Sequence, residues 1–195
     1  MPRRPTTFSF DTSPSTPRRS IWAFTAFFPL PPAQILDIGA GTGRDAGWFA
    51  RAGYSVTAVE PSQVMRMRAM RLHPSPAIEW IDDSLPGLET LTDRGAAFDV
   101  VQLSAVWMHL DTDERRAAMP RLARLLKAGG VLMMLVRRGP VPEGRIMFEV
   151  PVEETLGLAA STGLRALHYE LQESAGEVNR RAGVIWMNHV FQKPL

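Results

Sequence analysis

The sequence predicts an α/β fold: a mostly parallel sheet with helices on both faces, closed by an antiparallel β-hairpin at the C-terminus. Three observations support this. Strand-like and helix-like segments alternate from residue 33 onward, a glycine-rich turn follows the first strand, and the last strand-like segment alternates in polarity as hairpin strands do. The chain has 195 residues, 45% of them hydrophobic and 22% charged, which suits one domain with a substantial core.

The expected elements follow one another along the chain. Residues 1–20 are rich in Pro, Ser, Thr and Arg without apolar periodicity, so we expect a flexible arm before a domain at 21–195. A short helix is expected at 21–28. Seven strands are predicted, at 34–38, 55–59, 77–81, 98–103, 130–136, 165–172 and 184–192. Five further helices are predicted, at 44–52, 62–72, 85–91, 111–127 and 151–161.

Capping residues define several of these helix boundaries. Gly53 should end the first long helix, and Ser62 should cap the next one. Asp111 and Glu114 have the spacing of a capping box. Pro120 should kink the helix after Asp111 or begin a second one.

Composition excludes several classes of protein. Without cysteine there is no disulfide framework, thiolate nucleophile or cysteine–metal cluster, and no His–carboxylate spacing indicates a metal site. No apolar run approaches the ~18 residues of a membrane span, and the proline-broken segment 21–30 makes a poor secretory signal. The net charge is only +2 and arginines occur in pairs, so a phosphate-tracking surface is not expected. We therefore expect a cytoplasmic protein, a monomer or homodimer, with a small-molecule substrate and no nucleic-acid or membrane partner.

The turn after the first strand carries the strongest motif. Its sequence is Asp37-Ile38-Gly39-Ala40-Gly41-Thr42-Gly43-Arg44, in which alternate glycines let the backbone turn tightly and approach a ligand. The third glycine comes one place too early for the nicotinamide fingerprint G-x-G-x-x-G, and no P-loop Gly-Lys-Ser/Thr follows. Glu60 ends the second strand, where its carboxylate can accept both hydroxyls of a ribose.

With these residues the chain resembles the class I S-adenosylmethionine-dependent methyltransferases from residue 34 to the C-terminus. The resemblance extends to Asp82-Asp83-Ser84-Leu85-Pro86, to 98–101 and to 125–130, with Ala128 where the family commonly has proline. It implies a Rossmann-like seven-stranded sheet whose last two strands form the hairpin. It also implies S-adenosyl-L-methionine as cofactor and S-adenosyl-L-homocysteine as product.

The resemblance further implies roles for individual cofactor-binding residues. The backbone of Gly39, Ala40, Gly41 and Gly43 would face the amino-acid part of the cofactor, Asp37 its ammonium group, and Glu60 its ribose. Either Asp82 or Asp83 would accept from the adenine amino group, with a slight preference for Asp83, and the alternative for this pair is a helix cap. Two more residues complete the predicted cofactor set: Met65 against the adenine, and Ser104 at the end of the fourth strand.

The acceptor side is less defined by sequence. His109 is the candidate general base because its ordinary pKa lies near neutrality, although capping the next helix is a slightly better interpretation. Trp107 either walls the methyl site or packs in the core. Arginines after the fifth strand have the chemistry to clamp an acidic acceptor, against a more ordinary interpretation as a solvated loop: Arg137, Arg138 and Arg145.

The leading hypothesis is a methyltransferase acting on a small molecule. No Asn/Asp-Pro-Pro-aromatic sequence follows the fourth strand, which argues against the amine substrates of DNA and some protein methyltransferases. Two alternatives stay open, namely methylation of RNA or protein and a module that binds the cofactor without turnover. A nicotinamide-dependent oxidoreductase is disfavoured by the glycine spacing.

Overall fold

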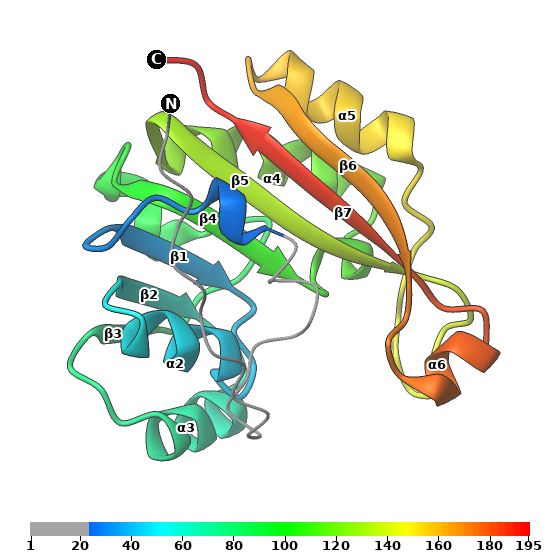
Figure 1. Cartoon of the computed structure of the whole chain (residues 1–195), viewed down its shortest axis with the longest axis horizontal. Coiled ribbons are helices and arrows are strands. Elements are labelled where there is room, and N and C mark those ends of the chain that lie inside the picture. Colours follow the sequence, from blue (N-terminus) through cyan, green and yellow to red (C-terminus); the bar gives the residue numbers. More distant parts are fainter. Residues whose placement is uncertain (1–23) are drawn as a thin grey trace.

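The computed structural model describes residues 24–195. The predicted arm at 1–20 and the start of the predicted helix at 21–28 lie outside the described residues. The rest of that helix is a single 3-10 turn, η1 (Thr25–Phe27). The described chain builds one seven-stranded sheet flanked by helices (Figure 1), which confirms the predicted fold class.

The strands stand in the order β3-β2-β1-β4-β5-β7-β6. Neighbouring strands from β3 to β5 are parallel, whereas β7 is antiparallel to both β5 and β6, as predicted for a C-terminal hairpin. Their bounds are β1 (Gln34–Ile38), β2 (Ser55–Val59), β3 (Ile78–Ile81), β4 (Phe98–Ser104), β5 (Leu126–Arg138), β6 (Arg165–Glu173) and β7 (Ile185–Gln192). The helices are α2 (Arg44–Arg51), α3 (Gln63–Leu72), η2 (Glu89–Arg94), η3 (Trp107–His109), α4 (Thr112–Leu125), α5 (Val152–Ser161) and α6 (Glu177–Arg181).

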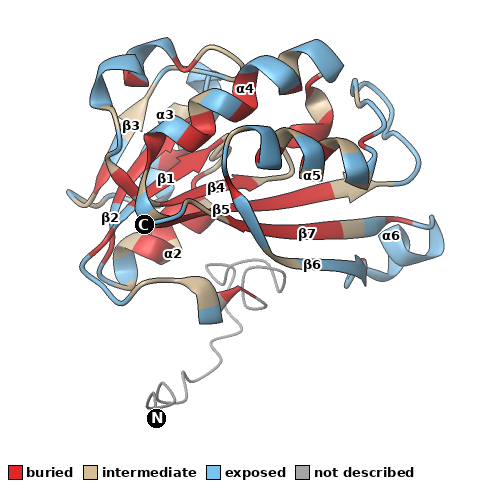
Figure 2. Ribbon diagram, turned by 90° about the horizontal axis from the view of Figure 1, so that it is seen from above, coloured by how far each residue is buried: buried red, intermediate tan, exposed pale blue. Residues whose placement is uncertain are grey.

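Each face of the sheet has its own apolar core, because side chains alternate along a strand. In β1, Leu36 and Ile38 pack with α4 and α5, whereas Ile35 packs on the other face with α2 and Phe24. The central strands are buried on both faces, and the β6 edge is exposed (Figure 2).

Several predicted helix boundaries are confirmed. Ser62 caps α3 by accepting from the Met65 N–H, and Asp111 and Glu114 form the complete capping box of α4. Gly53 follows α2 with a φ of 92°, a left-handed conformation that suits glycine.

Three predictions differ from the structure. The helix predicted at 85–91 is wrong: a left-handed Leu88, with φ 48°, precedes the 3-10 helix η2. Of the two alternatives for Pro120, the second helix is wrong, because α4 continues through it; the proline lies on the exposed side, where water can hydrate the carbonyl that it leaves unpaired. The short helix α6 between β6 and β7 was not predicted.

The order in which strands are added to the sheet reverses between β1 and β4, although the two strands are parallel. Strands β2 and β3 extend the sheet on one side of β1, and β4 and β5 extend it on the other. The connections therefore diverge at the carboxyl ends of β1 and β4, which is where ligands bind in open sheets of this kind. The glycine-rich turn lies at this point.

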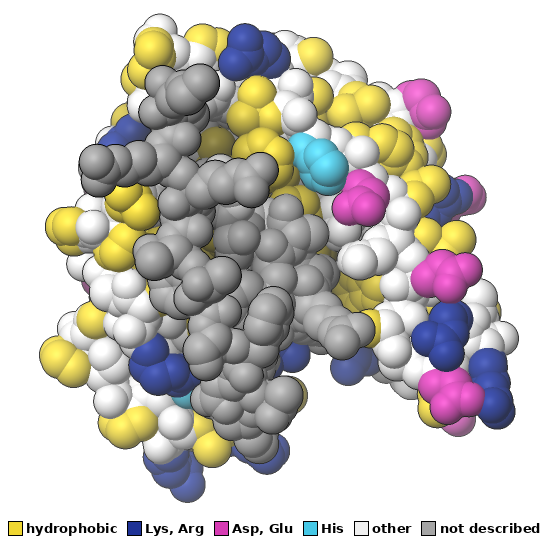
Figure 3. All heavy atoms as spheres, viewed as in Figure 1, with side chains coloured by type: hydrophobic (Ala, Val, Ile, Leu, Met, Phe, Trp, Pro, Cys, Tyr) yellow, Lys and Arg dark blue, Asp and Glu magenta, His cyan; other side chains and the backbone are white. Residues whose placement is uncertain are grey.

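Two further properties concern partners. None of the helices among residues 24–195 is long and apolar enough to cross a membrane. On the face shown in Figure 3, the described Lys and Arg side chains are scattered, and acidic and basic groups mix at the α6 end.

His189 on β7 gives the first testable prediction. Its imidazole is fully buried, neither ring nitrogen has a partner, and burial lowers its pKa to about 4. The unfolded chain therefore takes up this proton near pH 6.5 while the folded chain does not, so the contribution to stability is lost as the pH falls. We expect His189→Leu to gain about 1.4 kcal/mol of stability relative to the native chain per pH unit below 6.5, down to about pH 4. Urea unfolding of both proteins at several pH values measures this difference, and parallel pH profiles would contradict it.

Candidate active site

The glycine-rich turn is held in a left-handed, open conformation. Gly39, Gly41 and Gly43 have φ values of 70°, 59° and 76°. A Cβ atom on Gly39 would collide with Val106, and one on Gly43 with Trp80, whereas one on Gly41 would meet nothing within 4 Å. The open side of the turn is therefore at Gly41.

Glu60 braces this turn from the end of β2. Its Oε2 accepts from the Gly41 N–H at 2.8 Å and its Oε1 from the Ser62 N–H at 2.9 Å. The Val59 carbonyl accepts from the N–H groups of Gly39 and Ala40, so the turn is tied to β2 at several points. The carboxylate of Glu60 is 8% exposed and retains lone pairs for a further donor.

Asp37, the last polar residue of β1, lies beneath the turn. It is 2% exposed, and its Oδ2 atom has no hydrogen-bond partner. Burial, reinforced by the Asp45 carboxylate, raises the pKa of Asp37 to about 8. With Ser104 at the end of β4, Asp37 lines a cavity of about 180 Å³, completed by Gly39, Ala40, Gly41, Thr42, Arg44 and Asp45.

The three residues predicted to contact adenine differ in their exposure and in their hydrogen-bond partners. Asp82 is exposed and pairs with the Arg66 guanidinium at 2.6 Å. Asp83 accepts from the N–H groups of Ser84 and Thr90 and from the Thr90 hydroxyl, so its carboxylate is engaged within the segment that leads into η2. These bonds lower the pKa of Asp83. Met65, in the first turn of α3, is 44% exposed.

Trp107 and His109 leave η3 in different directions. Trp107 is fully buried in the core that α4 and α5 cover, and its indole N–H donates to the Thr155 hydroxyl at 3.3 Å. It presents no surface to a ligand, so packing is the interpretation that the structure supports. His109 lies near the surface with Nδ1 2.6 Å from the Ile146 carbonyl. Because a carbonyl only accepts, Nδ1 carries a proton, and in the neutral ring Nε2 is then an acceptor.

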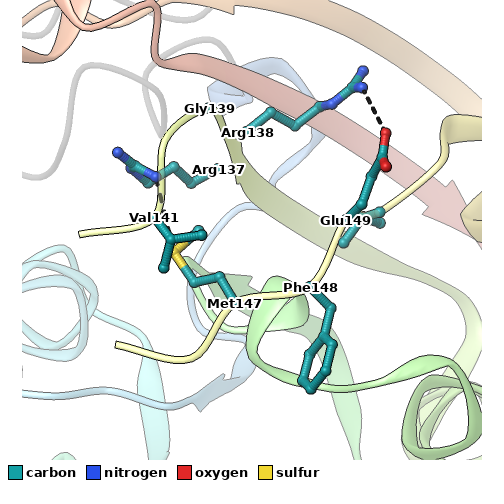
Figure 4. A pocket seen from close by; sticks show the side chains of 8 residues that line it. Arg137, Arg138, Gly139, Val141, Met147, Phe148 and Glu149 are labelled. Carbon is teal, nitrogen blue, oxygen red and sulfur yellow. Dashed lines mark hydrogen bonds and ion pairs between the residues drawn. The ribbon is translucent and has the colours of Figure 1, made fainter. Parts of the chain in front are cut away.

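Two arginines at the end of β5, Arg137 and Arg138, help to line a second pocket, of about 260 Å³. Arg137 and Arg138 point in opposite directions from the strand end (Figure 4). Arg137 donates to the Pro140 carbonyl, and Arg138 pairs with Glu149 at 3.6 Å. Arg145 is exposed and does not line this pocket. The loop runs on past η3, where the Phe148 N–H donates to the Met108 carbonyl.

Comparison with known proteins identifies the family. Residues 35–130 match a family described as a methyltransferase domain. The chain belongs to the class I S-adenosylmethionine-dependent methyltransferases. Over 137 residues it is 26% identical to glycine N-methyltransferase of Oryctolagus cuniculus, a match that covers 59% of this chain and 46% of that protein. This methyltransferase chain spans about half the length of the curated relatives that it matches.

Solved structures resemble the whole methyltransferase fold. A methyltransferase from Methanosarcina mazei superposes with a TM-score of 0.73 at 18% identity, covering 89% of this chain and 97% of that one. The 1,6-didemethyltoxoflavin-N1-methyltransferase of Burkholderia thailandensis, solved with S-adenosylhomocysteine, gives a TM-score of 0.67 at 20% identity, covering 91% and 82%. At such identities the likeness establishes the fold.

Three buried polar residues were not singled out from the sequence. Asp45 lines the cavity and raises the pKa of Asp37; its position directly after the glycine turn was an available signal. Gln102, opposite Asp37, is a lone amide within an apolar strand. Arg115 is 1% exposed and joins Glu154 of α5 to the carbonyls of Leu110 and Glu149, with no signal in the local sequence. Among residues 24–195 no three His, Cys, Asp or Glu side chains gather as a metal site.

Proposed function

We propose that this chain transfers the methyl group of S-adenosylmethionine to a small-molecule acceptor. The observation that carries the proposal is the cavity at the carboxyl ends of β1 and β4. A buried Asp37 oxygen without a partner faces into it, beneath a turn that is open at Gly41. An unpartnered buried carboxylate suits an ammonium group, and an open glycine turn suits close approach by an amino-acid moiety.

The residues present fit this cofactor. Asp37 would hold its ammonium group, the backbone at Gly39–Gly41 its amino-acid part, and Glu60 its ribose. Ser104 offers a buried hydroxyl without a partner on the same cavity. At the adenine end Asp82 is the more available carboxylate, since Asp83 is occupied by Thr90 and Ser84. Met65 stays a prediction for the adenine face.

The chemistry needs little from the protein beyond alignment. When bound, the cofactor supplies a methyl group on a sulfonium sulfur, which passes to a nucleophilic atom of the acceptor and leaves S-adenosylhomocysteine. The protein has to orient the acceptor and exclude water. Where the acceptor atom carries a proton, the free Nε2 of His109 can accept it, because Nδ1 is fixed by the Ile146 carbonyl.

The relatives support a small acceptor by their names, glycine for one and 1,6-didemethyltoxoflavin for another. The pairing of Arg138 with Glu149 reduces the charge available to an acidic acceptor, so we do not assign the arginines a binding role. A cytoplasmic location, suggested by the lack of cysteine, belongs to the same proposal.

Isotopically labelled cofactor tests this function directly. The purified chain is incubated with methyl-labelled S-adenosylmethionine and a cell extract divided into small molecules, RNA and protein. We expect label in the small molecules, and none when Gly41→Val replaces the native chain. Label in RNA or protein would overturn the acceptor class. Binding of S-adenosylhomocysteine without transfer to any fraction would instead indicate a binding module.

A further inference from the structure

A row of buried polar side chains extends from the cofactor cavity across one face of the sheet. Gln102 on β4 lies opposite Asp37, and Leu135 of β5 lies opposite both Ser104 on β4 and Asn188 on β7. Since side chains alternate, all of these project from the face that also carries α2. The row thus runs from Asp37 towards the C-terminal hairpin.

These polar groups have no partner within the protein. Gln102 is 1% exposed and Asn188 is fully buried, and neither amide makes a hydrogen bond through its oxygen or its nitrogen. The Ser104 hydroxyl is likewise buried and unpaired. Buried polar groups are almost always hydrogen-bonded, because leaving them unpaired destabilises the fold. A row of unpaired groups beside a ligand cavity is therefore explained by a ligand that satisfies them.

The position of each group divides the row in two. Gln102 is next to Asp37 in the register of β1 and β4, which places it on the cofactor side. Asn188 lies two strands further, with Ser104 between it and Asp37 along the face. It is therefore on the side of the cavity away from the glycine turn.

We propose that Asn188 recognises the methyl acceptor, and that the acceptor is an uncharged molecule presenting a hydrogen-bond donor beside an acceptor. An amide offers both a donor and an acceptor. A lactam or amide edge satisfies such a site, whereas an ionised carboxylate or phosphate, which only accepts, leaves the amide oxygen without a donor. Glu170, opposite Asn188 on β6, disfavours an anion here. This inference rests on the proposed methyl transfer.

The test replaces Asn188 by leucine, an apolar side chain of similar size. Since the amide is unsatisfied in the folded protein, Asn188→Leu is expected to raise Tm by about 2–6 °C. Its affinity for S-adenosylhomocysteine, measured by calorimetry, should stay within about twofold of the native value. Transfer of label from methyl-labelled cofactor into the uncharged small molecules of an extract, separated from anions by ion exchange, should fall at least about tenfold. A residue with a merely structural role would not combine higher stability with lost transfer.

His189→Leu is the matched control. His189 is the next residue on β7, equally buried and unpaired, but its side chain projects from the opposite face with Met187 and Phe191. This variant should also become more stable while keeping full transfer. Asn188→Ser supplies a second, smaller change, expected to raise KM more than it lowers kcat.

Three results would overturn the inference while leaving the proposed function intact. The first is native transfer by Asn188→Leu, and the second is a lower Tm that accompanies its lost transfer. The third is label that enters only the anionic small molecules. Absence of transfer by the native chain, with S-adenosylhomocysteine still bound, would instead reject the proposed function itself.

Discussion

Valine at position 41 is expected to abolish binding of S-adenosylhomocysteine while the chain remains folded. A Cβ atom on Gly41 would meet no protein atom within 4 Å, so the added side chain would enter the ligand cavity and not the core. We expect affinity to fall by more than about 100-fold, to below detection by calorimetry. The left-handed φ of 59° adds a conformational cost of about 1–2 kcal/mol, which the thermal unfolding curve will show.

Gly163→Val provides a matched control for that conformational cost. Gly163 also has a left-handed φ, 81°, and a Cβ atom there would likewise meet nothing within 4 Å. It follows α5 and precedes β6, far along the chain from the glycine turn. We expect a similar loss of stability with native affinity. Gly39 and Gly43 are less suitable, since side chains there would strike Val106 and Trp80 and distort the turn. Tight binding by Gly41→Val would show that the cavity does not hold the cofactor.

The sequence was sufficient for those features that depend on local patterns. The order of strands and helices, the hairpin and the caps at Ser62 and Asp111 follow from periodicity and short-range hydrogen bonds. The glycine turn is predictable for a similar reason, because glycine at alternate positions favours a left-handed backbone there. The helix predicted at residues 85–91 was wrong because Leu88 adopts a left-handed conformation, which its residue type does not predict.

Contacts between distant segments could not be predicted in this way. That Trp107 faces Thr155 rather than the ligand depends on how η3 packs against α5, 48 residues later. The neutralising partner of Arg138 lies across a loop at Glu149. Likewise, an amide such as Asn188 shows its importance only when the register places it on the same sheet face as the cavity. Sequence therefore singled out residues that line the cavity at the end of β1, and it gave little information on residues that depend on packing between distant elements.

The affinity for S-adenosylhomocysteine is expected to rise with pH between about 6 and 8. In the free protein Asp37, with its pKa raised to about 8, is protonated over most of this range. An ammonium group needs the ionised carboxylate, so binding must expel the proton, and affinity should increase by up to about tenfold per pH unit until the pH reaches the pKa of the free protein. Calorimetry at pH 6.5 in two buffers of different ionisation enthalpy should detect the release of about one proton.

Two carboxamide substitutions test whether the Asp37 carboxylate causes this pH dependence. Asp37→Asn should bind at least about 100-fold more weakly at pH 8 and lose the dependence, because an uncharged amide pairs poorly with an ammonium group. Asp45→Asn removes the negative charge that helps to raise the pKa of Asp37, so its affinity profile should move to lower pH. An unchanged profile in Asp45→Asn, or a flat one in the native chain, would mean that Asp37 is not the group that holds the ammonium.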